Sequence, residues 1–339
     1  MNPQTSDNDF MRQALDLAKK GEGFTLPNPM VGAVIVKDGK IIGQGYHKKI
    51  GSAHAEIEAL KNIKDQKAVG ATLYVNLEPC SHFGKTPPCT KAIIKSNISR
   101  VVFSTLDPNP RVSGQGLSAL KNAGIKVSVG LLKEEAEKLN AVFFNFHKNK
   151  RPFIALKFAS SLDGKIATYS FDSRGITGKK SIEYSYSLRS QYQAILVGIN
   201  TVLLDDPNLG THSKSKKDPL RIILDSKLQI PLVSQVLRDK NVLIATTESA
   251  DSVKKEHFKK LGIELLIFKD NQIPLGKLLK ELADREIISV LVEGGGRTLG
   301  NFIDENLYDK LYGFYAPIII GGEKAITSVE GTGVEFISQ

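Results

Sequence analysis

The chain alternates between short β-type runs and helical patterns along most of its 339 residues, and this alternation restricts it to an α/β fold. In the first half, the run 31–46 places Asp38 and Gly39 between two β-type segments, which is a strong hairpin signal. Further strands are predicted over 71–77, 100–105 and 125–129, and helices over 54–64, 90–96, 116–123 and 131–146. The first half should therefore form a layered α/β unit of its own.

The second half shows the same alternation but does not resemble the first half in sequence. Strands are predicted over 153–158, 194–198, 221–225, 242–246, 263–268 and 289–293, and helices over 180–191, 252–261, 275–284 and 299–305. Between the halves, the polar and basic stretch 147–152 ends in proline, which is typical of a linker. We therefore expect two domains, residues 1–148 and residues 149–339.

The formal net charge of +10 limits the kinds of partner that the chain attracts. A positive field draws nucleic acid, a membrane surface or phosphorylated small molecules, and it also serves solubility. The Lys and Arg residues are scattered, and the densest cluster lies on the predicted helix 252–261 beside acids. Phosphorylated small molecules are therefore sufficient as partners, and neither nucleic acid nor a membrane is expected.

The sequence contains two cysteines, whose role depends on the compartment. Residues 1–23 lack the basic start and continuous apolar run of a secretion signal, and no apolar stretch approaches the roughly 20 residues that span a bilayer. A cytoplasmic location is therefore expected. In that reducing environment a lone pair of cysteines more often binds metal or takes part in catalysis than forms a disulfide.

The neighbours of the two cysteines indicate a catalytic zinc site. His54-Ala55-Glu56 is followed by Pro79-Cys80 and then by Cys89, which matches the H-x-E and P-C parts of the zinc deaminase signature. Three ligands, His54, Cys80 and Cys89, leave the fourth tetrahedral position for water. Zinc lowers the pKa of bound water to about 7, and Glu56 is suited to act as the general acid/base. The spacing thus predicts attack by zinc hydroxide on an amino-substituted ring.

Other interpretations of this pattern remain open at the level of the residues. A lone His-x-Glu is usually part of a surface helix, and a structural zinc site would need four protein ligands where the sequence supplies three candidates. A deaminase that edits nucleic acid uses the same zinc chemistry. It does not require the residues 81–88 between the cysteines, nor a second α/β domain.

With these segments together, the first half resembles the bifunctional deaminase/reductase family of riboflavin biosynthesis. The matching segments are Asn28-Pro29-Met30-Val31-Gly32, Gly45-Tyr46-His47, His54-Ala55-Glu56, 78–89 and Asp107-Pro108-Asn109-Pro110. The resemblance implies a cytidine-deaminase-like three-layer domain. It also implies that 2,5-diamino-6-ribosylamino-4(3H)-pyrimidinone 5′-phosphate is deaminated to 5-amino-6-ribosylaminouracil 5′-phosphate. Its implied substrate contacts are Asn28, His47, His82 and Lys85, whereas Glu58 stands where the family is expected to have a histidine.

The second half resembles the NADPH-dependent reductase domain of the same family, whose fold is like that of dihydrofolate reductase. The matching segments are 157–168, 173–178, 198–207 and 292–296. The implied NADPH contacts are Ala159, Gly175, Thr201, Asp205, Gly295, Gly296, Arg297, Thr298, Leu299, Gly300 and Asn301. The implied contacts with the reductase substrate are Lys157, Ser173, Arg189, Leu209, His212 and Glu293. Independently of the resemblance, a glycine run after a strand and before a helix suits a close approach of backbone N–H groups to phosphate.

Two residues and the C-terminal end depart from the family pattern. Gly175 occupies a position where the family typically has tryptophan, and His212 one where an arginine often contacts phosphate. Further strands would be expected after Phe336, so the second domain is expected to be short at its C-terminus. The resemblance as a whole implies two consecutive reactions, deamination and then NADPH-dependent reduction of ribosyl to ribityl, by a homo-oligomer.

Overall fold

The computed structural model describes residues 6–63, 68–82, 87–213 and 217–337. The chain forms two compact units, Met1–Lys150 and Arg151–Gln339, and each is described by itself. Among the described residues, no helix has the length and apolar character that crossing a bilayer demands.

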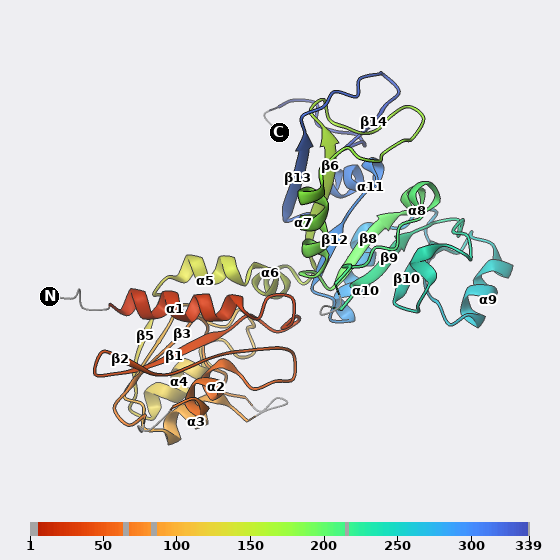
Figure 1. Ribbon diagram of the computed structural model, residues 1–339. Helices are drawn as coiled ribbons and strands as arrows, with labels where there is room; N and C mark the ends of the chain where they lie inside the picture. The colour runs from red at the N-terminus through yellow and green to blue at the C-terminus, as the bar shows by residue number, and fades with distance from the viewer. Residues whose placement is uncertain (1–5, 64–67, 83–86, 214–216, 338–339) are drawn as a thin grey trace. The chain divides into compact units, whose positions relative to one another are not determined.

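The first unit is a five-stranded sheet between two layers of helices (Figure 1). The strand order is β2-β1-β3-β4-β5, in which β1 runs antiparallel to β2 and β3, while β3, β4 and β5 are parallel. The strands are β1 (Gly32–Lys37), β2 (Lys40–Tyr46), β3 (Thr72–Val75), β4 (Arg100–Phe103) and β5 (Lys126–Val129). The helices are α1 (Asp7–Lys19), α2 (Ala55–Lys61), α3 (Cys89–Lys95), α4 (Gln115–Asn122), α5 (Lys133–Leu139) and α6 (Ala141–Asn149).

Alternation of apolar residues along the strands produces the three layers. Successive strand side chains point to opposite faces of a sheet, so each face collects every second residue. Ala33, Ile35, Leu73 and Val101 belong to the apolar cluster that includes residues of α2, α3 and α4, three helices that lie on one side of the sheet (Figure 1). The residues between them on the strands pack against α1 and α5 on the other face. Both faces of the central strands are buried, which is why these strands are short and almost wholly apolar.

A polar contact anchors the start of α1 to the sheet. Ser6 and Asp9 form a capping box at the helix N-terminus. Between them, the first helical residue, Asp7, accepts hydrogen bonds from the Tyr74 hydroxyl (2.6 Å) and the Arg100 guanidinium (2.6 and 3.1 Å). This contact orients the apolar side of α1 toward strands β3 and β4.

The prediction of a single helix over 131–146 is wrong, because Asn140 separates two helices, α5 and α6. The Asn140 side chain donates to the Met30 carbonyl (2.9 Å) and accepts from the Met30 N–H (2.8 Å). Asparagine favours such local alternatives to helical hydrogen bonding. The apolar periodicity continues through the break, so the pattern alone did not reveal it.

The second unit contains a seven-stranded parallel sheet of order β11-β10-β9-β8-β12-β6-β13. Its strands are β6 (Phe153–Ser161), β8 (Ala194–Gly198), β9 (Leu220–Leu224), β10 (Val242–Thr247), β11 (Glu264–Phe268), β12 (Ser289–Val292) and β13 (Lys310–Ala316). A separate two-stranded sheet joins β7 (Lys165–Ala167) to β14 (Ile326–Thr327). The helices are α7 (Lys179–Arg189), α8 (Ile199–Asp205), α9 (Ser252–Lys260), α10 (Leu275–Asp284) and α11 (Gly296–Asp304), with a short 3-10 turn, η1, at Gln235–Leu237.

Helices cover both faces of this parallel sheet, as parallel sheets require. Leu278, Leu282 and Phe302 of α10 and α11 pack on one face, and Val202 and Phe258 of α8 and α9 pack on the other. The sequence patterns did not predict α8, β7, β13 or β14. Helix α8 is seven residues long and follows β8 directly, so no turn residue separates the two patterns.

The C-terminal segment that follows β14 packs on α11 at Gly300, and this contact leads to a prediction. A Cβ atom at Gly300 would overlap the carbonyl oxygen of Glu330, whereas a Cβ at Gly276 in α10 would meet nothing within 4 Å. Gly300→Ala should lower the free energy of unfolding of the second unit by about 1–3 kcal/mol through overpacking. Gly276→Ala should leave it unchanged or raise it by up to about 1 kcal/mol, because alanine is the better helix former.

Thermal unfolding followed by calorimetry compares these two variants with the original chain. The same substitution is made in two helices of the same unit, so helix propensity is controlled. An unchanged transition for Gly300→Ala would mean that the segment around Glu330 is not packed on α11 as described.

Candidate active sites

Three metal-binding side chains converge at one end of the first sheet. The ligand atoms of His54, Cys80 and Cys89 all lie within 4.8 Å of one another. His54 Nδ1 is 3.5 Å from Cys80 Sγ and 3.3 Å from Cys89 Sγ. Ordinary zinc bond lengths in a tetrahedron put such nitrogen and sulfur atoms about 3.6 Å apart. Both nitrogen–sulfur separations are therefore close to those that a shared zinc ion requires.

Local structure explains how residues distant in sequence meet here. His54 is the N-cap of α2, Cys80 lies in the loop after β3, and Cys89 is the first residue of α3. The Cys89 N–H donates to Cys80 Sγ (3.3 Å), and the Thr90 N–H donates to the Cys80 carbonyl (3.1 Å). Cys80 therefore occupies the N-terminal end of α3 in space, where exposed N–H groups stabilise a thiolate.

The two thiols differ in acidity. Hydrogen bonding with Cys89 is the main cause that lowers the pKa of Cys80 to about 4, against the opposing effect of burial. The hydrogen bond with Cys80 in turn raises the pKa of Cys89, and burial adds to this. Hydrogen bonding to Cys80 also raises the pKa of His54. The cluster therefore carries the negative charge of the Cys80 thiolate, which a bound cation would neutralise.

Glu56 stands beside this cluster in the first turn of α2, with 4% of its surface exposed. Burial raises the pKa of Glu56 to about 7, and the negative charge of Cys80 acts in the same direction. A carboxyl group with this pKa is able both to accept and to donate a proton near neutral pH. The position of Glu56 at the same helix end as His54 agrees with the arrangement expected from the His-x-Glu spacing.

Sequence reasoning missed the structural role of Glu78. Its carboxylate accepts hydrogen bonds from the N–H groups of Asp107 (3.1 Å), Gly114 (3.0 Å) and Leu117 (3.0 Å). It thereby holds the loop 107–117 against the segment that carries Cys80. Asp107 lies close enough that burial, followed by the charges of Glu78 and Cys80, raises its pKa. Glu78 is two residues before Cys80 in the Glu-Pro-Cys segment, which was the available signal.

Two of the predicted contacts for the deaminase substrate meet each other. Asn28 Nδ2 is 3.3 Å from His47 Nε2, and the ring of His47 packs edge-on against His54 with centroids 5.7 Å apart. Burial lowers the pKa of His47. This chain of contacts places Asn28 beside the metal cluster.

The other predicted contacts for this substrate are less closely tied to the cluster. His82 is exposed and makes an electrostatic contribution at Asp107. Lys85 lies outside the described residues. Glu58, at the unusual position, forms an ion pair with Lys48 (2.8 Å) on the loop that follows His47.

Two asparagines that were not singled out in the sequence fix the segment after Asn28. Asn76 donates to the Met30 carbonyl (3.0 Å) and accepts from the Gly32 N–H (2.8 Å). Asn140 pairs with both backbone groups of Met30. Both side chains are at least 96% buried, since Asn76 is 0% and Asn140 4% exposed. Their amides therefore make the backbone hydrogen bonds with Met30 and Gly32 that a neighbouring strand would otherwise supply.

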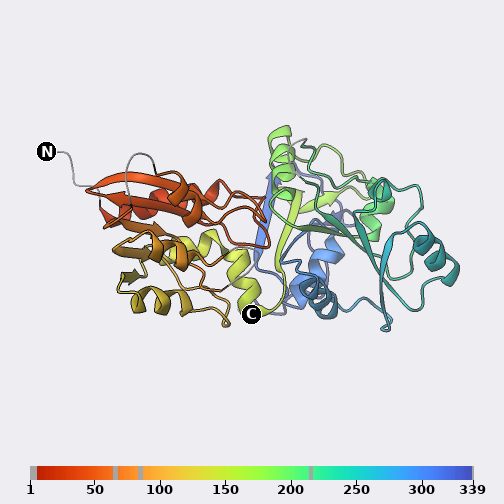
Figure 2. The same cartoon turned by 90° about the horizontal axis from the view of Figure 1, so that it is seen from below.

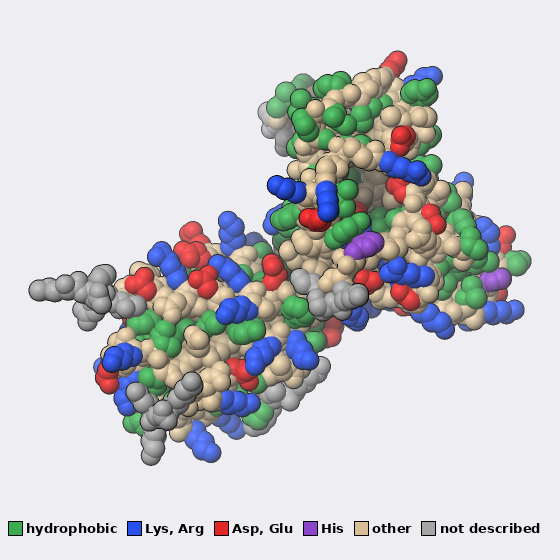
Figure 3. Space-filling model, viewed as in Figure 1, with side chains coloured by type: hydrophobic (Ala, Val, Ile, Leu, Met, Phe, Trp, Pro, Cys, Tyr) green, Lys and Arg blue, Asp and Glu red, His purple; other side chains and the backbone are tan. Residues whose placement is uncertain are grey.

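The second unit contains a cavity of about 1380 Å³. Figure 3 shows the hollow on this unit, with basic and acidic side chains at its edge. The volume exceeds the roughly 300–1,000 Å³ of typical small-molecule sites, which leaves room for a dinucleotide and a second molecule. The predicted residues that line it are Lys157, Ala159, Ser173, Gly175, Arg189, Thr201, Asp205, Leu209, Glu293, Gly295, Gly296, Arg297, Thr298, Leu299 and Asn301.

Two predicted residues do not line this cavity. Gly300 faces the backbone of Glu330 instead, on the side of α11 that the C-terminal segment covers. His212 stacks on Tyr186, with ring centroids 4.2 Å apart, and the guanidinium of Arg189 lies over the same Tyr186 ring at 5.4 Å. His212 is therefore connected to the cavity through Tyr186 and Arg189 rather than directly.

A buried ion pair organises the polar part of the cavity. Arg189 donates to both carboxylate oxygens of Glu293 (2.9 and 2.8 Å), and a third hydrogen bond reaches the Gly210 carbonyl (3.0 Å). Burial opposes both charges, but the pair outweighs it, so that the pKa of Glu293 is lowered and that of Arg189 is raised. Burial lowers the pKa of Lys157, which shares this environment.

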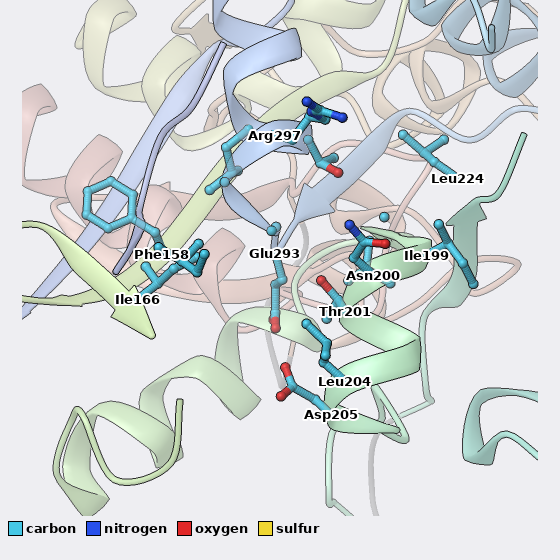
Figure 4. Close-up of a pocket in the computed structure, with 18 of the residues that line it drawn as sticks. Phe158, Ile166, Ile199, Asn200, Thr201, Leu204, Asp205, Leu224, Glu293 and Arg297 are labelled. Atoms are coloured by element: carbon cyan, nitrogen blue, oxygen red, sulfur yellow. The ribbon is translucent and has the colours of Figure 1, made fainter. Parts of the chain in front are cut away.

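The glycine run Gly294-Gly295-Gly296 leads into α11 at the cavity wall. N–H groups in the first turn of a helix have no partner within the helix, and together with the helix dipole they attract phosphate. Figure 4 shows Thr201, Leu204 and Asp205 on one helix, with the Glu293 side chain pointing toward them. Ser173 donates to Asp205 (3.2 Å), which joins two predicted segments across the cavity. Of these features, the N-terminus of α11 is the one that fits a dinucleotide phosphate.

Both units match known protein families. Residues 4–105 match the cytidine and deoxycytidylate deaminase zinc-binding region, and residues 152–337 match the RibD C-terminal domain. These matches define a two-domain enzyme, a zinc-dependent deaminase followed by a reductase.

Relatives over the full length identify the family. The riboflavin biosynthesis protein RibD of Aquifex aeolicus (strain VF5) is 48% identical over 330 residues, which cover 96% of this chain and 92% of that protein. The chain belongs to the RibD family. RibD of Escherichia coli (strain K12) is 38% identical, with 94% of this chain and 89% of that protein covered.

Solved structures agree with this assignment. Acinetobacter baumannii RibD superimposes with a TM-score of 0.89 at 37% identity, covering 98% of this chain and 92% of that chain. A diaminohydroxyphosphoribosylaminopyrimidine deaminase/5-amino-6-(5-phosphoribosylamino)uracil reductase from Thermotoga maritima gives 0.85 at 41% identity, with the same two coverages of 98% and 92%.

The comparisons confirm the predicted α/β fold, with a cytidine-deaminase-like domain first and a dihydrofolate-reductase-like domain second. They also confirm an enzyme of riboflavin biosynthesis that has deaminase and reductase activities. The chain carries a zinc-binding deaminase domain and a reductase domain related to NADPH-dependent reductases. The alternatives of a nucleic-acid editor and a structural zinc module do not account for these matches.

The geometry of the metal cluster predicts that one substitution weakens zinc binding and that another leaves it unchanged. Cys89→Ala removes one of three zinc donors and should weaken zinc binding by more than about 100-fold, since loss of an outer-shell partner alone costs 10–100-fold. Glu56→Gln should keep about one zinc per chain, because the cluster does not need Glu56 as a ligand. Metal analysis after dialysis against a weak chelator measures both, and loss of zinc from Glu56→Gln would contradict the role given to Glu56.

Proposed function

We propose that residues 1–148 deaminate 2,5-diamino-6-ribosylamino-4(3H)-pyrimidinone 5′-phosphate to 5-amino-6-ribosylaminouracil 5′-phosphate. Residues 149–339 then reduce the ribosyl group of that product to ribityl with NADPH. The observation that carries the first step is the convergence of His54, Cys80 and Cys89 beside the buried Glu56. Family membership over nearly the whole chain supports the order of the two steps.

In the deaminase site, His54, Cys80 and Cys89 hold zinc, which when bound supplies activation of the attacking water. Water adds to the ring carbon that bears the amino group, the carbon–nitrogen bond breaks, and ammonia leaves as the ring gains a carbonyl. Glu56 relays the two protons of the water in turn, the first to the ring nitrogen and the second to the departing amine. Its pKa of about 7 suits both transfers, since neither protonation state is costly near neutral pH.

We assign substrate recognition in this site to Asn28, His47, His82 and Lys85. Asn28 offers both a donor and an acceptor to a pyrimidine or ribosyl group. Lys85 is the candidate for the phosphate, since an ammonium group is an effective point charge for it. Asp107, which Glu78 holds near the cluster, adds a carboxyl group at the same end of the site.

In the reductase site, NADPH supplies the hydride. We assign its binding to Ala159, Gly175, Thr201, Asp205, residues 295–299 and Asn301. The helix N-terminus at Gly296 and the cationic Arg297 meet its phosphates. Gly175 leaves open space where a larger side chain is typical of the family, because a Cβ there would meet nothing within 4 Å.

We assign the reductase substrate to Lys157, Ser173, Arg189, Leu209 and Glu293, with His212 acting through Tyr186 and Arg189. Opening of the ribosyl ring and reduction of its first carbon consume one hydride and one proton. Lys157 is the candidate proton donor, because burial lowers its pKa while Glu293 nearby favours its charged form. The Arg189–Glu293 pair keeps Glu293 ionised beside it.

We also propose that the enzyme is a cytoplasmic homo-oligomer. A reducing compartment keeps Cys80 and Cys89 available as thiolates for zinc. Strand β13 lies at an edge of its sheet, and its Leu311 and Tyr315 are 48% and 62% exposed, which supports an association between chains.

Incubation of the zinc-loaded protein with the diaminopyrimidine ribosyl phosphate tests both steps. Ammonia should be released without NADPH, and NADPH should be oxidised only after ammonia appears. Glu56→Gln should lower the deamination rate by about 10²–10⁴, the usual contribution of a general acid/base, while it still reduces the deaminated intermediate. No ammonia from the original protein would refute the deaminase assignment, and ammonia without NADPH oxidation would refute the reductase assignment.

The position of Lys157 predicts a pH dependence for reduction. A lysine must be protonated to donate, so activity falls as pH rises through its pKa, and burial places that pKa below the ordinary value of about 10.4. The reduction rate should therefore decline at a lower pH than an exposed lysine would dictate. Lys157→Met should lower the rate by about 10²–10⁴.

Absorbance of NADPH with the deaminated intermediate, measured from neutral to alkaline pH, follows this decline. Ammonia release by Lys157→Met serves as the control for folding and should match that of the original protein. Undiminished NADPH oxidation by Lys157→Met would remove Lys157 from the mechanism.

A further inference from the structure

The guanidinium of Arg189 is bound on two sides at the wall of the large cavity. The Glu293 carboxylate accepts two of its five N–H groups, and the Gly210 carbonyl accepts a third. These contacts leave two N–H groups for a molecule in the cavity that Arg189 lines. Because the guanidinium is planar and rigid, the direction of those two groups depends on where Glu293 and Gly210 hold it.

The supports of this guanidinium are not equally fixed. Arg189 is the last residue of α7, which lies beside β13 (Figure 2), where the rings of Tyr184 and Phe314 are 5.9 Å apart. Glu293 directly follows the buried strand β12. Gly210 instead lies between α8 and β9, outside the sheet, and glycine permits a wide range of backbone conformations. Its carbonyl therefore needs a support of another kind.

That support comes from Asp218, which binds the other end of the same peptide group. Asp218 Oδ1 accepts hydrogen bonds from the Thr211 N–H (2.8 Å) and from the Thr211 hydroxyl (3.0 Å). The N–H of Thr211 and the carbonyl of Gly210 belong to one planar trans peptide, so they point in opposite directions. The hydrogen bond that holds the N–H toward Asp218 therefore holds the carbonyl toward Arg189.

Polar side chains enclose Gly210 closely. A Cβ atom at Gly210 would lie 2.9 Å from Asp218 Oδ2 and 3.1 Å from both Arg238 Nη2 and Asn208 Oδ1. The Gly210 N–H donates to the same Asn208 oxygen (2.7 Å). The next peptide is thus bound at its N–H and at its carbonyl, and the space around it admits no side chain at this position.

Asp218 also acts on Arg189 through its charge. Burial opposes ionisation of Asp218, but hydrogen bonds from Thr211 and the charge of Arg238 outweigh it and lower the pKa of this carboxyl. Burial likewise opposes the charge of Arg189. The contacts with Glu293 outweigh that effect, and the negative charge of Asp218 adds to the raised pKa of Arg189.

We propose that Asp218 is a positioning residue for the reductase substrate, which holds the Gly210–Thr211 peptide so that the guanidinium of Arg189 keeps one orientation at the cavity wall. A fixed guanidinium binds a pair of acceptor oxygens on one molecule, as in a phosphate group. Asp218 acts through Arg189, since Asp218 itself is not among the residues that line the cavity. The inference rests on the proposed reductase function.

Two substitutions separate the acceptor oxygen of Asp218 from its charge. Asp218→Ala removes the acceptor of the Thr211 N–H, whereas Asp218→Asn keeps an oxygen for it and removes the charge. Asp218→Ala should raise KM for the deaminated intermediate by about two-fold to ten-fold, the range that one hydrogen bond supports, and leave KM for NADPH unchanged. Asp218→Asn should restore KM for the intermediate toward the original value. NADPH absorbance at varied concentrations of each reactant measures both constants.

Arg238→Gln is the matched control, because it removes the other partner of Asp218 (3.0 Å) and leaves the contact with Thr211 in place. It should change neither KM. Ammonia release, which we assign to the first unit, should be the same in every variant. Asp218→Ala that raises KM for NADPH as much as KM for the intermediate would give Asp218 a general structural role in the cavity and would overturn the proposal.

Combination with Arg189→Lys tests whether Asp218 acts through Arg189. Lysine keeps a positive charge beside Glu293 but has no planar fork with which to bind Glu293 and Gly210 in fixed directions. In the Arg189→Lys background, Asp218→Ala should have no further effect on KM for the intermediate. Effects that multiply in the double variant would mean that Asp218 acts independently of Arg189, contrary to the proposal.

The restraint on the guanidinium is measurable without any substrate. NMR spectra of arginine-labelled protein, assigned with Arg189→Lys, should show an Nε–H signal held by Glu293 and an Nη1–H signal held by Gly210. Asp218→Ala should broaden the Nη1–H signal and preserve the Nε–H signal. An unchanged Nη1–H signal would refute the inference even where NADPH is oxidised. Absence of NADPH oxidation by the original protein with the deaminated intermediate would instead refute the proposed reductase function, so the two failures are distinguishable.

Discussion

Burial of ionisable groups around one point is the constraint on which the deaminase domain depends. Cys80, Cys89, His54 and Glu56 lie together where water screens their charges poorly, and an uncompensated charge there is costly. Hydrogen bonding with Cys89 lowers the pKa of Cys80, whereas burial raises the pKa of Glu56, which leaves a thiolate at Cys80 and a protonatable carboxyl at Glu56. A divalent cation satisfies the sulfur and nitrogen donors together. The helix starts, the loop after β3 and the Glu78 clamp all serve to bring these groups to that point.

In the reductase domain, an ion pair compensates the buried charges. Arg189 and Glu293 are 12% and 8% exposed in their side chains, and they compensate each other through two hydrogen bonds. Removing one partner of such a pair leaves a buried charge, which commonly costs 3–5 kcal/mol. The two residues implied as substrate contacts are therefore also a condition for the cavity to keep its shape. Lys157 lies in the same environment, and burial lowers the pKa of its ammonium group.

Much of the fold followed from local patterns, and the departures have physical reasons. The central strands β1, β3 and β4 of the first sheet were predicted well because both of their faces are buried, so that their apolar runs are nearly continuous. The break at Asn140 escaped prediction because it depends on a bond to Met30, 110 residues away in sequence. Helix α8 escaped because it follows β8 without a turn residue. Glu78, Asn76 and Asn140 act on backbone groups of distant segments, and no spacing rule identifies such partners.

By itself, the sequence determined the alternating α/β layers, the chemistry of a three-ligand zinc site at His54, Cys80 and Cys89, and the acid/base role proposed for Glu56. Residue type and spacing suffice for these, because ligand chemistry and strand periodicity are local properties. The tertiary structure alone decided the raised pKa of Glu56, the pairing of Arg189 with Glu293 and the contact of Asn28 with His47. Each of these depends on burial and on the direction of hydrogen bonds between segments that the sequence leaves far apart.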